Sequence, residues 1–300
     1  MNTKISLRIE RDVDGIVTVV LDVNPEKPRG GVVVLDRWLI DQIRMAMEVV
    51  EAGQKPSGLI LMSASSRVFV AGADLAEIDA LGDEELHEYL KAGSRAFGML
   101  SRQKCPSVAV IHKAALGGGL EVAMHCQALI GTLPAEGEKP WRIGLPECGL
   151  GICPGWGGTQ MLPARMAPAE AIQATAAGTT WECGKMPEGL MAQVLPAGSD
   201  LLAAARAWIR GPGTAACQGA QQREWQPLAI NHSNARPMAD ALRAARASLP
   251  ATKAASAVAE CVEAGIQNGF EAGLAAERKH LVSLRHTPEA REKLAAFLKR

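Results

Sequence analysis

Three short segments in the first half of the chain are almost wholly apolar and rich in β-branched residues. They run from Ile16 to Val23, from Gly58 to Ala64 and from Ser107 to Ile111. Continuous apolar runs of this length are typical of strands that are buried on both faces, as in parallel sheets covered by helices. The pattern therefore predicts three buried strands.

Between these strands, apolar positions recur at helical spacing. The segment from Leu35 to Glu51 carries them three or four positions apart, at Leu35, Leu39, Ile43, Met47 and Val50. A second helix is expected to begin near Asp83 and to include the stretch LHEYLKAGSRAFGML. Because strands alternate with helices, the predicted fold class is α/β.

Beyond Pro163 the chain is rich in alanine and predicts helices. The expected helical stretches are MAPAEAIQATAAG, DLLAAARAWIRG, PMADALRAARASL and two or three further helices between Lys253 and Arg300. The last helix is expected to start after Thr287, a good N-cap residue that is followed by Pro288 at the first helical position. Residues 211–226 show no regular pattern and are expected to form a connector.

Composition excludes several classes of function. The chain has 300 residues, of which 48% are hydrophobic and 21% charged, which fits one large globular domain or two small ones. Its 32 basic and 32 acidic residues leave no net charge, so no overall field attracts nucleic acid or an anionic membrane. The seven cysteines form no CxxC pair and no apolar run reaches about 18 residues, so we expect reduced thiols and a cytoplasmic protein.

Three glycine-bearing turns are candidates for binding an anion. They are the segments Val70 to Asp74 (VAGAD), Leu116 to Gly119 (LGGG) and Gly151 to Gly158 (GICPGWGG). A glycine turn between a strand and a helix exposes backbone N–H groups at the positive end of the helix, and two such turns facing each other would form an oxyanion hole. Each could also be merely a tight turn. None matches the GxGxxG or GxxxxGK[ST] pattern, so a dinucleotide or ATP site is poorly supported.

Two glutamates lie beside these turns. Glu121 follows the three glycines in an apolar helix start, and Glu147 precedes the Gly/Pro-rich loop. Either residue alone could be a helix-capping partner or a solvated turn residue. Together, in apolar settings that raise the pKa of a carboxyl group, they suit general acid and base catalysis.

Other candidate chemistries fit less well. His112 and His125 flank the glycine run without any recognised metal-ligand spacing. Cys148 and Cys153 have no basic partner nearby in the sequence and are interpreted as buried small apolar residues. The GxSxG motif of many serine hydrolases is absent.

Three sequence blocks carry a resemblance to a known family. RVFVAGADLAEI, IHKAALGGGLEVAMHC and WRIGLPECGLGICPGWGGTQMLP occur in an order and at separations similar to those of the crotonase superfamily, the enoyl-CoA hydratases and isomerases. The third block is similar to the hydratase part of bacterial multifunctional fatty-acid oxidation α-subunits. The tail from Val258 to Arg300 resembles the helical linker that follows the hydratase in those proteins.

The resemblance implies hydration of trans-2-enoyl-CoA thioesters in fatty-acid β-oxidation. The backbone N–H groups of Ala73 and Gly118 would hold the thioester oxygen, Glu121 would activate water, and Glu147 would exchange the proton at C2. Further substrate-binding residues implied by position are Ala71, Gly72, Asp74, Gly117, Leu145, Pro146 and Gly155. Coenzyme A is then part of the substrate, and neither a separate cofactor nor a metal is expected.

The implied fold is a spiral of ββα turns in residues 1–200, followed by a helical C-terminal region in residues 201–300. That region would serve oligomerisation or close the acyl pocket. The resemblance further implies a homo-oligomer, a trimer or a dimer of trimers, and allows a separate dehydrogenase or thiolase as a partner.

Two other functions stay open: a Δ3-to-Δ2 enoyl-CoA isomerase, and a non-catalytic subunit that binds CoA esters and pairs with a dehydrogenase. The chain departs from the family in its CoA-binding region, where Val33 replaces a residue that is usually polar and Ala76 replaces a common lysine. Lys113 replaces a usual glycine. Lys27 and Arg29 either compensate for these changes or are exposed loop charges.

Overall fold

The strands of the computed structural model, which describes residues 4–213 and 227–299, form two sheets. The larger has the strand order β1-β2-β3-β5-β7-β10 and the smaller the order β4-β6-β8-β9. The strands are β1 (Arg8–Arg11), β2 (Ile16–Leu21), β3 (Gly58–Ser63), β4 (Val68–Val70), β5 (Ser107–Ile111), β6 (Ala114–Leu116), β7 (Ala128–Thr132), β8 (Arg142–Gly144), β9 (Thr180–Glu182) and β10 (Gln193–Leu195). Neighbouring strands are parallel except in the pairs β1–β2 and β8–β9.

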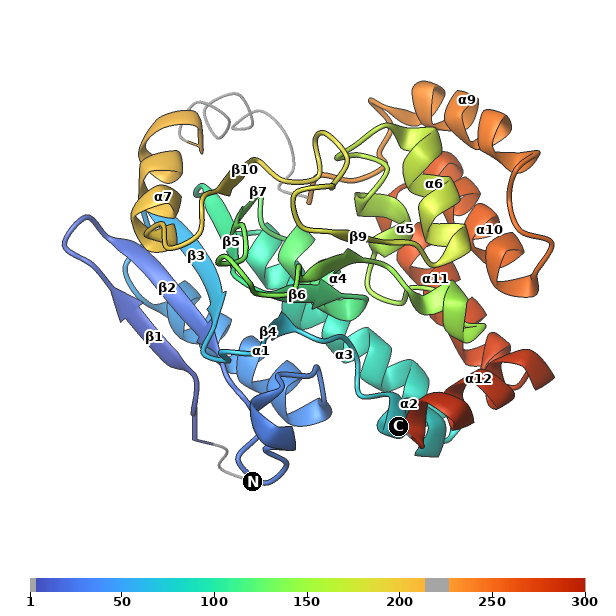
Figure 1. Ribbon diagram of the computed structural model, residues 1–300, viewed down its shortest axis with the longest axis horizontal. Helices are drawn as coiled ribbons and strands as arrows, with labels where there is room; N and C mark the ends of the chain where they lie inside the picture. Colours follow the sequence, from blue (N-terminus) through green and yellow to red (C-terminus); the bar gives the residue numbers. More distant parts are fainter. Residues whose placement is uncertain (1–3, 214–226, 300) are drawn as a thin grey trace.

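Consecutive strands alternate between the two sheets. The pairs β3 and β4, β5 and β6, and β7 and β8 each place one strand in the larger sheet and the next in the smaller. After β2 the chain runs beside the turn that follows β4, where Leu35 and Ala73 form an isolated parallel bridge. The chain thus winds as a spiral with helices between its turns, which confirms the predicted α/β fold of repeated ββα units (Figure 1).

The helices follow the sequence pattern closely. They are α1 (Arg37–Ala52), α2 (Leu75–Ala80), α3 (Asp83–Ser101), α4 (Gly118–Met124), α5 (Gly158–Met161), α6 (Pro168–Ala177), α7 (Leu201–Trp208), α9 (Ala235–Arg246), α10 (Lys253–Asn268), α11 (Phe270–Leu284) and α12 (Pro288–Leu298), with short helical turns η1 (Arg29–Gly31), η2 (Glu147–Leu150) and η3 (Ile209–Gly213). Helix α1 starts later than its apolar pattern because the carboxylate of Asp36 accepts the N–H of Leu39 and fixes the N-cap there. Thr287 caps α12 in the same way, as its sequence predicts.

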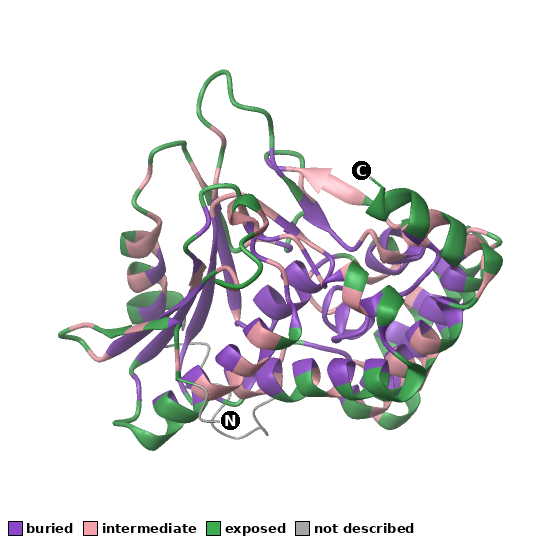
Figure 2. Cartoon of the chain, turned by 90° about the horizontal axis from the view of Figure 1, so that it is seen from below, coloured by how far each residue is buried: buried purple, intermediate pink, exposed green. Residues whose placement is uncertain are grey.

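The predicted buried strands are present as β2, β3 and β5, and both of their faces are covered. Ile16, Ile60 and Val108 pack toward α7, in a cluster that includes Ala205, whereas the alternate residues of the same strands belong to the main core. A strand can be apolar at every position only when each face is buried in this way. Figure 2 shows the resulting layer of buried strands between helices.

The C-terminal helices pack on the side of the molecule opposite α7 (Figure 1). Helix α11 lies against α10, α3 and α5, helix α10 also contacts α6 and α9, and α12 contacts α2 and η2. Residues 253–299, the described part of this tail, therefore contain three helices, within the two or three that the sequence predicts. The expected connector, 211–226, lies mostly outside the described residues, and its first three residues complete η3. The division at residue 200 stays a prediction.

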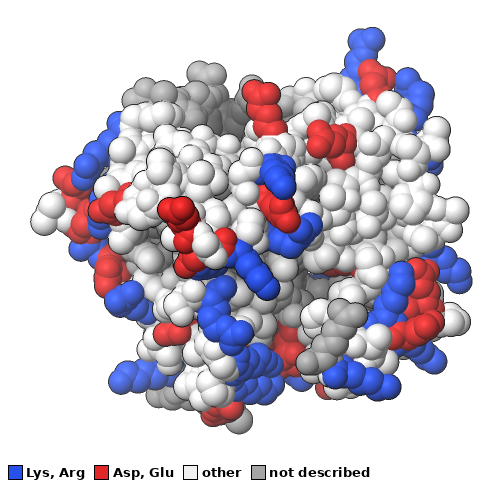
Figure 3. Space-filling model, viewed as in Figure 1, with Lys and Arg blue, Asp and Glu red and all other residues white. Residues whose placement is uncertain are grey.

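Charges of both signs are interspersed on the face of the molecule shown in Figure 3. This distribution agrees with the zero net charge of the chain. Within the two described ranges, no helix combines the length and the apolar character needed to cross a membrane.

Candidate active site

A cavity of about 460 Å³ opens where the turn after β4, the start of α4 and the loop after β8 meet. Helices α11 and α12 close it with Leu281, Phe297 and Leu298. The sequence-predicted residues that line it are Ala71, Gly72, Ala73, Asp74, Gly117, Gly118, Glu121, Pro146, Glu147 and Gly155. Leu145, also expected to bind substrate, is instead a buried core residue that packs close to Gly158. The fold thus brings together residues from three separate sequence blocks.

Two backbone turns stand side by side at the wall of this cavity. Strands β4 and β6 are parallel neighbours, so the turns that follow them leave the same edge of the sheet. A Cβ on Gly72 would lie 3.1 Å from the carbonyl oxygen of Leu116 and 3.9 Å from the nitrogen of Gly118. Among the described residues, neither the N–H of Ala73 nor that of Gly118 has a protein acceptor. Both amides line the cavity and are available to a ligand oxygen.

The three consecutive glycines are required by close contacts. Gly117 has φ of +53°, a conformation that L side chains rarely adopt, and its N–H donates to the carbonyl of Gly144 at 2.9 Å. A Cβ on Gly118 would lie 2.5 Å from Cζ3 of Trp156. A Cβ on Gly119 would collide with the carbonyl oxygen of Val70. Side chains here would push the Gly118 amide away from the cavity.

Glu121 lies in the first turn of α4 with only 1% of its surface exposed. Its Oε1 accepts the backbone N–H groups of Trp156 and Gly158, both at 2.8 Å. Burial raises the pKa of Glu121 well above its usual range, and the charges of Glu277 and Glu147 raise it further. In the described part of the chain, no group pairs with Oε2, which leaves that oxygen for a bound molecule in the cavity.

Glu147 starts η2, directly after β8 and Pro146. The side chain is partly exposed as a whole, but its Oε2 is enclosed and has no hydrogen-bond partner within the described residues. Burial raises the pKa of Glu147 to about 8, and the charge of Glu277 acts in the same direction. An enclosed carboxylate oxygen without a donor favours the protonated form of its group.

The two carboxyl groups differ in their hydrogen bonding. Two N–H donors stabilise the ionised form of Glu121, whereas the free Oε2 of Glu147 has no such donor. Burial acts against these donors and raises the pKa of both carboxyl groups. The arrangement places two carboxyl groups with raised pKa beside two N–H groups, which suits general acid and base catalysis.

A third buried carboxylate, Glu277 of α11, was missed by the sequence reasoning. It is fully buried and accepts the N–H of Gly157 at 2.6 Å, and the N–H and Oγ1 of Thr159 at 2.9 and 2.5 Å. Burial raises the pKa of Glu277 to about 7. A sequence signal existed: Glu277 lies three positions after Leu274 and four before Leu281, on the apolar stripe of its helix.

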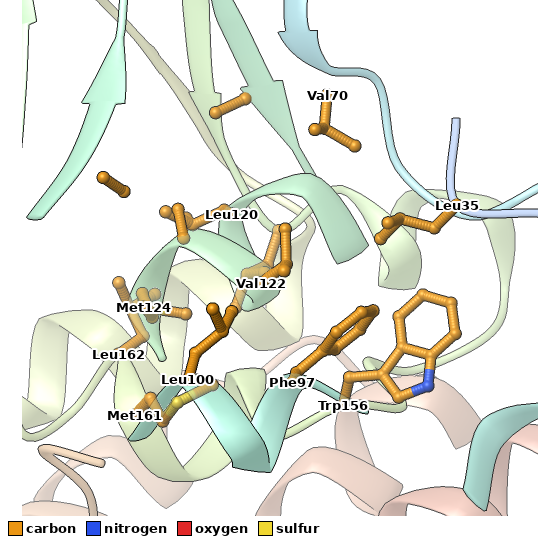
Figure 4. Packing of buried hydrophobic residues seen from close by; sticks show 14 of the residues in the cluster. Leu35, Val70, Phe97, Leu100, Leu120, Val122, Met124, Trp156, Met161 and Leu162 are labelled. Atoms are coloured by element: carbon orange, nitrogen blue, oxygen red, sulfur yellow. The ribbon is translucent and has the colours of Figure 1, made fainter. Parts of the chain in front are cut away.

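Trp156 packs against the turn at Gly118. Figure 4 shows Trp156 beside Phe97. Its indole stacks edge to face with Tyr89 and Phe97, with ring centroids 5.4 Å apart in both pairs. The indole Nε1–H donates to the carbonyl of Leu90 at 2.9 Å. These contacts fix the backbone N–H of Trp156 where Glu121 accepts it.

An acidic cluster borders the cavity at Asp74. One carboxylate oxygen of each of Asp36, Asp74 and Glu77 lies within 4.8 Å of the others, a spacing that could hold a metal ion. Arg29 pairs with Asp36 at 3.3 Å and also with Asp74, and Lys27 pairs with Glu77 at 3.1 Å. The cluster is therefore neutralised by the protein's own cations. Arg29 is partly buried rather than an exposed loop charge.

Val33 and Ala76 are the residues at which the chain departs from the family in the expected CoA-binding region. Val33 is fully buried, and its carbonyl accepts the N–H of Ala71 at 2.9 Å, which supports the turn after β4. Ala76 lines the cavity near the start of α2. Neither side chain offers a polar group to a CoA moiety.

Of the histidines and cysteines that flank the site, Cys153 alone is among the described residues that line the cavity. His112 bonds to a backbone carbonyl at 2.6 Å, and the buried His125 bonds to a serine hydroxyl at 2.7 Å. Burial raises the pKa of both the Cys148 and the Cys153 thiol, which makes them poor nucleophiles.

Comparison with known proteins gives the family. The enoyl-CoA hydratase/isomerase family model matches residues 30–217, and the chain belongs to this family. A fatty acid oxidation complex subunit alpha from Shewanella amazonensis is 29% identical over 293 residues, which are 94% of this chain and 39% of that protein. The chain thus spans well under half the length of this relative.

Solved structures share the fold across nearly the whole chain. An enoyl-CoA hydratase from Bacillus halodurans superposes with a TM-score of 0.67 at 18% identity, covering 97% of this chain and 99% of that one. A carnitinyl-CoA dehydratase from Mycobacterium thermoresistibile gives a TM-score of 0.68 at 19% identity, covering 97% and 89%. The fold is therefore that of the crotonases.

Proposed function

We propose that this protein adds water to trans-2-enoyl-CoA thioesters. The observation that carries the proposal is that the unpaired amides of Ala73 and Gly118 line the same cavity as the carboxyl groups of Glu121 and Glu147. Two N–H donors suit an oxygen that becomes negative, and two carboxyl groups of opposite protonation suit the addition of a hydroxyl group and a proton. Membership of the hydratase/isomerase family supports the same chemistry.

In the proposed reaction, the thioester oxygen accepts hydrogen bonds from Ala73 and Gly118. The Oε2 of Glu121 takes a proton from water as the water oxygen bonds to C3. The C2–C3 π electrons move toward the thioester, and the resulting enolate oxygen is held by the two amides. Glu147 then donates its proton to C2. Each amide donor is expected to stabilise the transition state by about 3 kcal/mol, as in other oxyanion holes.

The lining of the cavity favours an alkyl chain in the acyl part of the substrate. The side chains of Ile78, Leu90, Leu150 and Ile152 are aliphatic and line the same space as the two amides. Coenzyme A is part of the substrate, so we propose no separate cofactor. Phe297 and Leu298 at the end of α12 are partly exposed and line the cavity.

The test is the loss of conjugated thioester absorbance with crotonyl-CoA and with a decenoyl-CoA. Glu121→Gln and Glu147→Gln should each lower kcat by at least about 10²-fold, because each removes a proton-transfer group. Glu136→Gln is the matched control, since Glu136 is exposed and distant from the cavity lining. An active wild type with two active variants would contradict the paired-carboxyl mechanism.

Absence of turnover by a wild type that still binds CoA esters would overturn the hydratase proposal. A 3-enoyl-CoA substrate then separates the isomerase, which needs the same amides and one carboxyl group, from a non-catalytic binding subunit. A role in fatty-acid β-oxidation, a homo-oligomer, a dehydrogenase or thiolase partner and a cytoplasmic location stay predictions from the sequence.

A further inference from the structure

Four successive backbone amides, in residues 156–159, alternate between two buried carboxylates. The first and third donate to Glu121, and the second and fourth donate to Glu277. Glu121 comes from α4 in the spiral, whereas Glu277 comes from α11 in the C-terminal helices. Residues 156–159 are therefore held by hydrogen bonds to two carboxylates. One of these, Glu121, is a catalytic group of the proposed reaction.

The geometry around Glu277 is closely fitted. Gly157 has φ of +103°, so its N–H turns away from that of its neighbours and toward α11. The backbone N–H and the hydroxyl group of Thr159 both donate to the same carboxylate oxygen of Glu277, Oε1. A Cβ on Gly273 of α11 would collide with the side chain of Gln160, which shows how closely the helix approaches the segment. Few other positions on α11 could deliver a carboxylate to this place.

We propose that Glu277 is a positioning residue for the Glu121 base: it fixes residues 156–159 so that two amides converge on Oε1 of Glu121, and its charge tunes the Glu121–Glu147 pair. This inference rests on the proposed hydration reaction. It assigns the helices after residue 250 a part in the active site beyond oligomerisation or closure of the acyl pocket.

The titratable groups near Glu277 come from several elements of the fold. The titratable groups are Glu121 of α4, Glu147 of η2, Cys153 before α5, Cys261 of α10 and Arg278 on α11 itself. The charge of Glu277 raises the pKa of both Glu121 and Glu147. Removing that charge should therefore lower both pKa values, and the acid limb of the pH profile should move to lower pH.

Three variants test the inference. Glu277→Gln removes the charge and replaces one acceptor oxygen by a donor that faces an N–H group. Glu277→Asp keeps the charge but shortens the reach. Glu271→Gln, at an exposed position of the same helix, is the matched control. We expect Glu277→Gln to lower kcat by about 10- to 100-fold with KM nearly unchanged, because the base is misplaced rather than substrate binding lost.

The pH profile separates positioning from mere folding support. For Glu277→Gln the acid limb should shift downward by at least about half a pH unit, whereas for Glu277→Asp it should stay near that of the wild type. A lower kcat with an unmoved acid limb in Glu277→Gln would overturn the inference, as would a wild-type kcat. If Glu277→Gln does not fold, the kcat of Glu277→Asp is the deciding measurement. A kcat equal to that of the control Glu271→Gln would overturn the proposal, whereas a kcat several-fold below that of the control would support it.

A measurement without turnover distinguishes failure of this inference from failure of the hydratase proposal. Infrared titration of the protonated carboxyl band reports the buried glutamates directly, whether or not the protein hydrates enoyl-CoA. We expect Glu277→Gln to lower the titration midpoint of the remaining carboxyl groups. An inactive wild type with this shift would refute hydration but keep the coupling, and an active wild type without the shift would refute the coupling.

Discussion

Oε1 of Glu147 occupies the space that a side chain on Gly117 would need. An ideal Cβ at Gly117 would collide with this oxygen, and the left-handed backbone of Gly117 excludes most side chains in any case. The turn that presents the Gly118 amide and the carboxyl group of Glu147 are thus packed directly against each other. A change at Gly117 should affect both parts of the site together.

Gly117→Ala is expected to abolish most activity. The new Cβ would displace Glu147 and strain the turn, so we expect kcat/KM to fall by at least about 10²-fold, as when an oxyanion-hole donor is lost. Gly137→Ala is the control, because Gly137 also has a positive φ of +82° but nothing within 4 Å of the added Cβ. The control should lose about 1 to 2 kcal/mol of stability from strain and keep full activity. Guanidinium unfolding and the hydration assay measure the two effects.

Stability should fall as the pH rises from about 5.5 to 8.5. Burial raises the pKa of Glu277 to about 7 and that of Glu147 to about 8, so the native state retains protons that the unfolded chain releases near pH 4.5. The stabilising effect is complete below that unfolded value and is lost as the pH passes through the native values. In urea unfolding, the free energy of unfolding should depend less on pH for Glu277→Gln than for the wild type. Over this pH range the difference between the two changes should be up to roughly 3 kcal/mol.

An equal pH dependence in both proteins would contradict this electrostatic account. Measurements above pH 5.5 avoid the exposed carboxyl groups whose pKa is lowered by their partners, such as Asp83 beside Arg285 and His286. Those groups lose their stabilising effect only at lower pH. Their contribution to stability falls as the pH falls, which is opposite to the effect of the buried glutamates.

Arg29→Ala should destabilise the fold strongly. Arg29 neutralises Asp36 and Asp74, whose side chains are 1% and 8% exposed, and each of these aspartates caps a helix. Leaving the two buried carboxylates unpaired should cost about 3 kcal/mol or more. Arg44→Ala breaks only exposed pairs on α1 and should cost less than about 1 kcal/mol. Similar urea midpoints for the two variants would refute the proposed role of Arg29.

The end of α12 should influence the use of longer acyl chains. Phe297 and Leu298 line the cavity while remaining 49% and 42% exposed, so they offer apolar surface to a substrate tail. The double change to alanine should raise KM for a decenoyl-CoA several-fold, by about 1 to 2 kcal/mol of lost apolar contact, and leave crotonyl-CoA unaffected. Lys299→Ala, one residue beyond the helix, is the control. An equal effect on both substrates would argue against contact with the tail.

Local patterns were sufficient for much of the fold and for part of the site. Most residues of β2, β3 and β5 are apolar because both faces of these strands are covered, and this is visible in the sequence as nearly continuous apolar runs. The glycine turns and the carboxyl groups of Glu121 and Glu147 were visible because each lies within a few residues of a strand or helix end. Their convergence on one cavity follows from the parallel order of β4, β6 and β8.

By itself, the sequence determined the class of fold, the turns and the candidate catalytic groups, since these depend on the period of apolar residues and on the conformational freedom of glycine. Only the tertiary structure decided which distant groups complete the site. Glu277 meets Gly157 and Thr159 across more than a hundred residues, and Arg29 meets Asp74 across 45. Such contacts depend on how α11 packs on α5 and how η1 packs beside α2, and no local spacing encodes that packing.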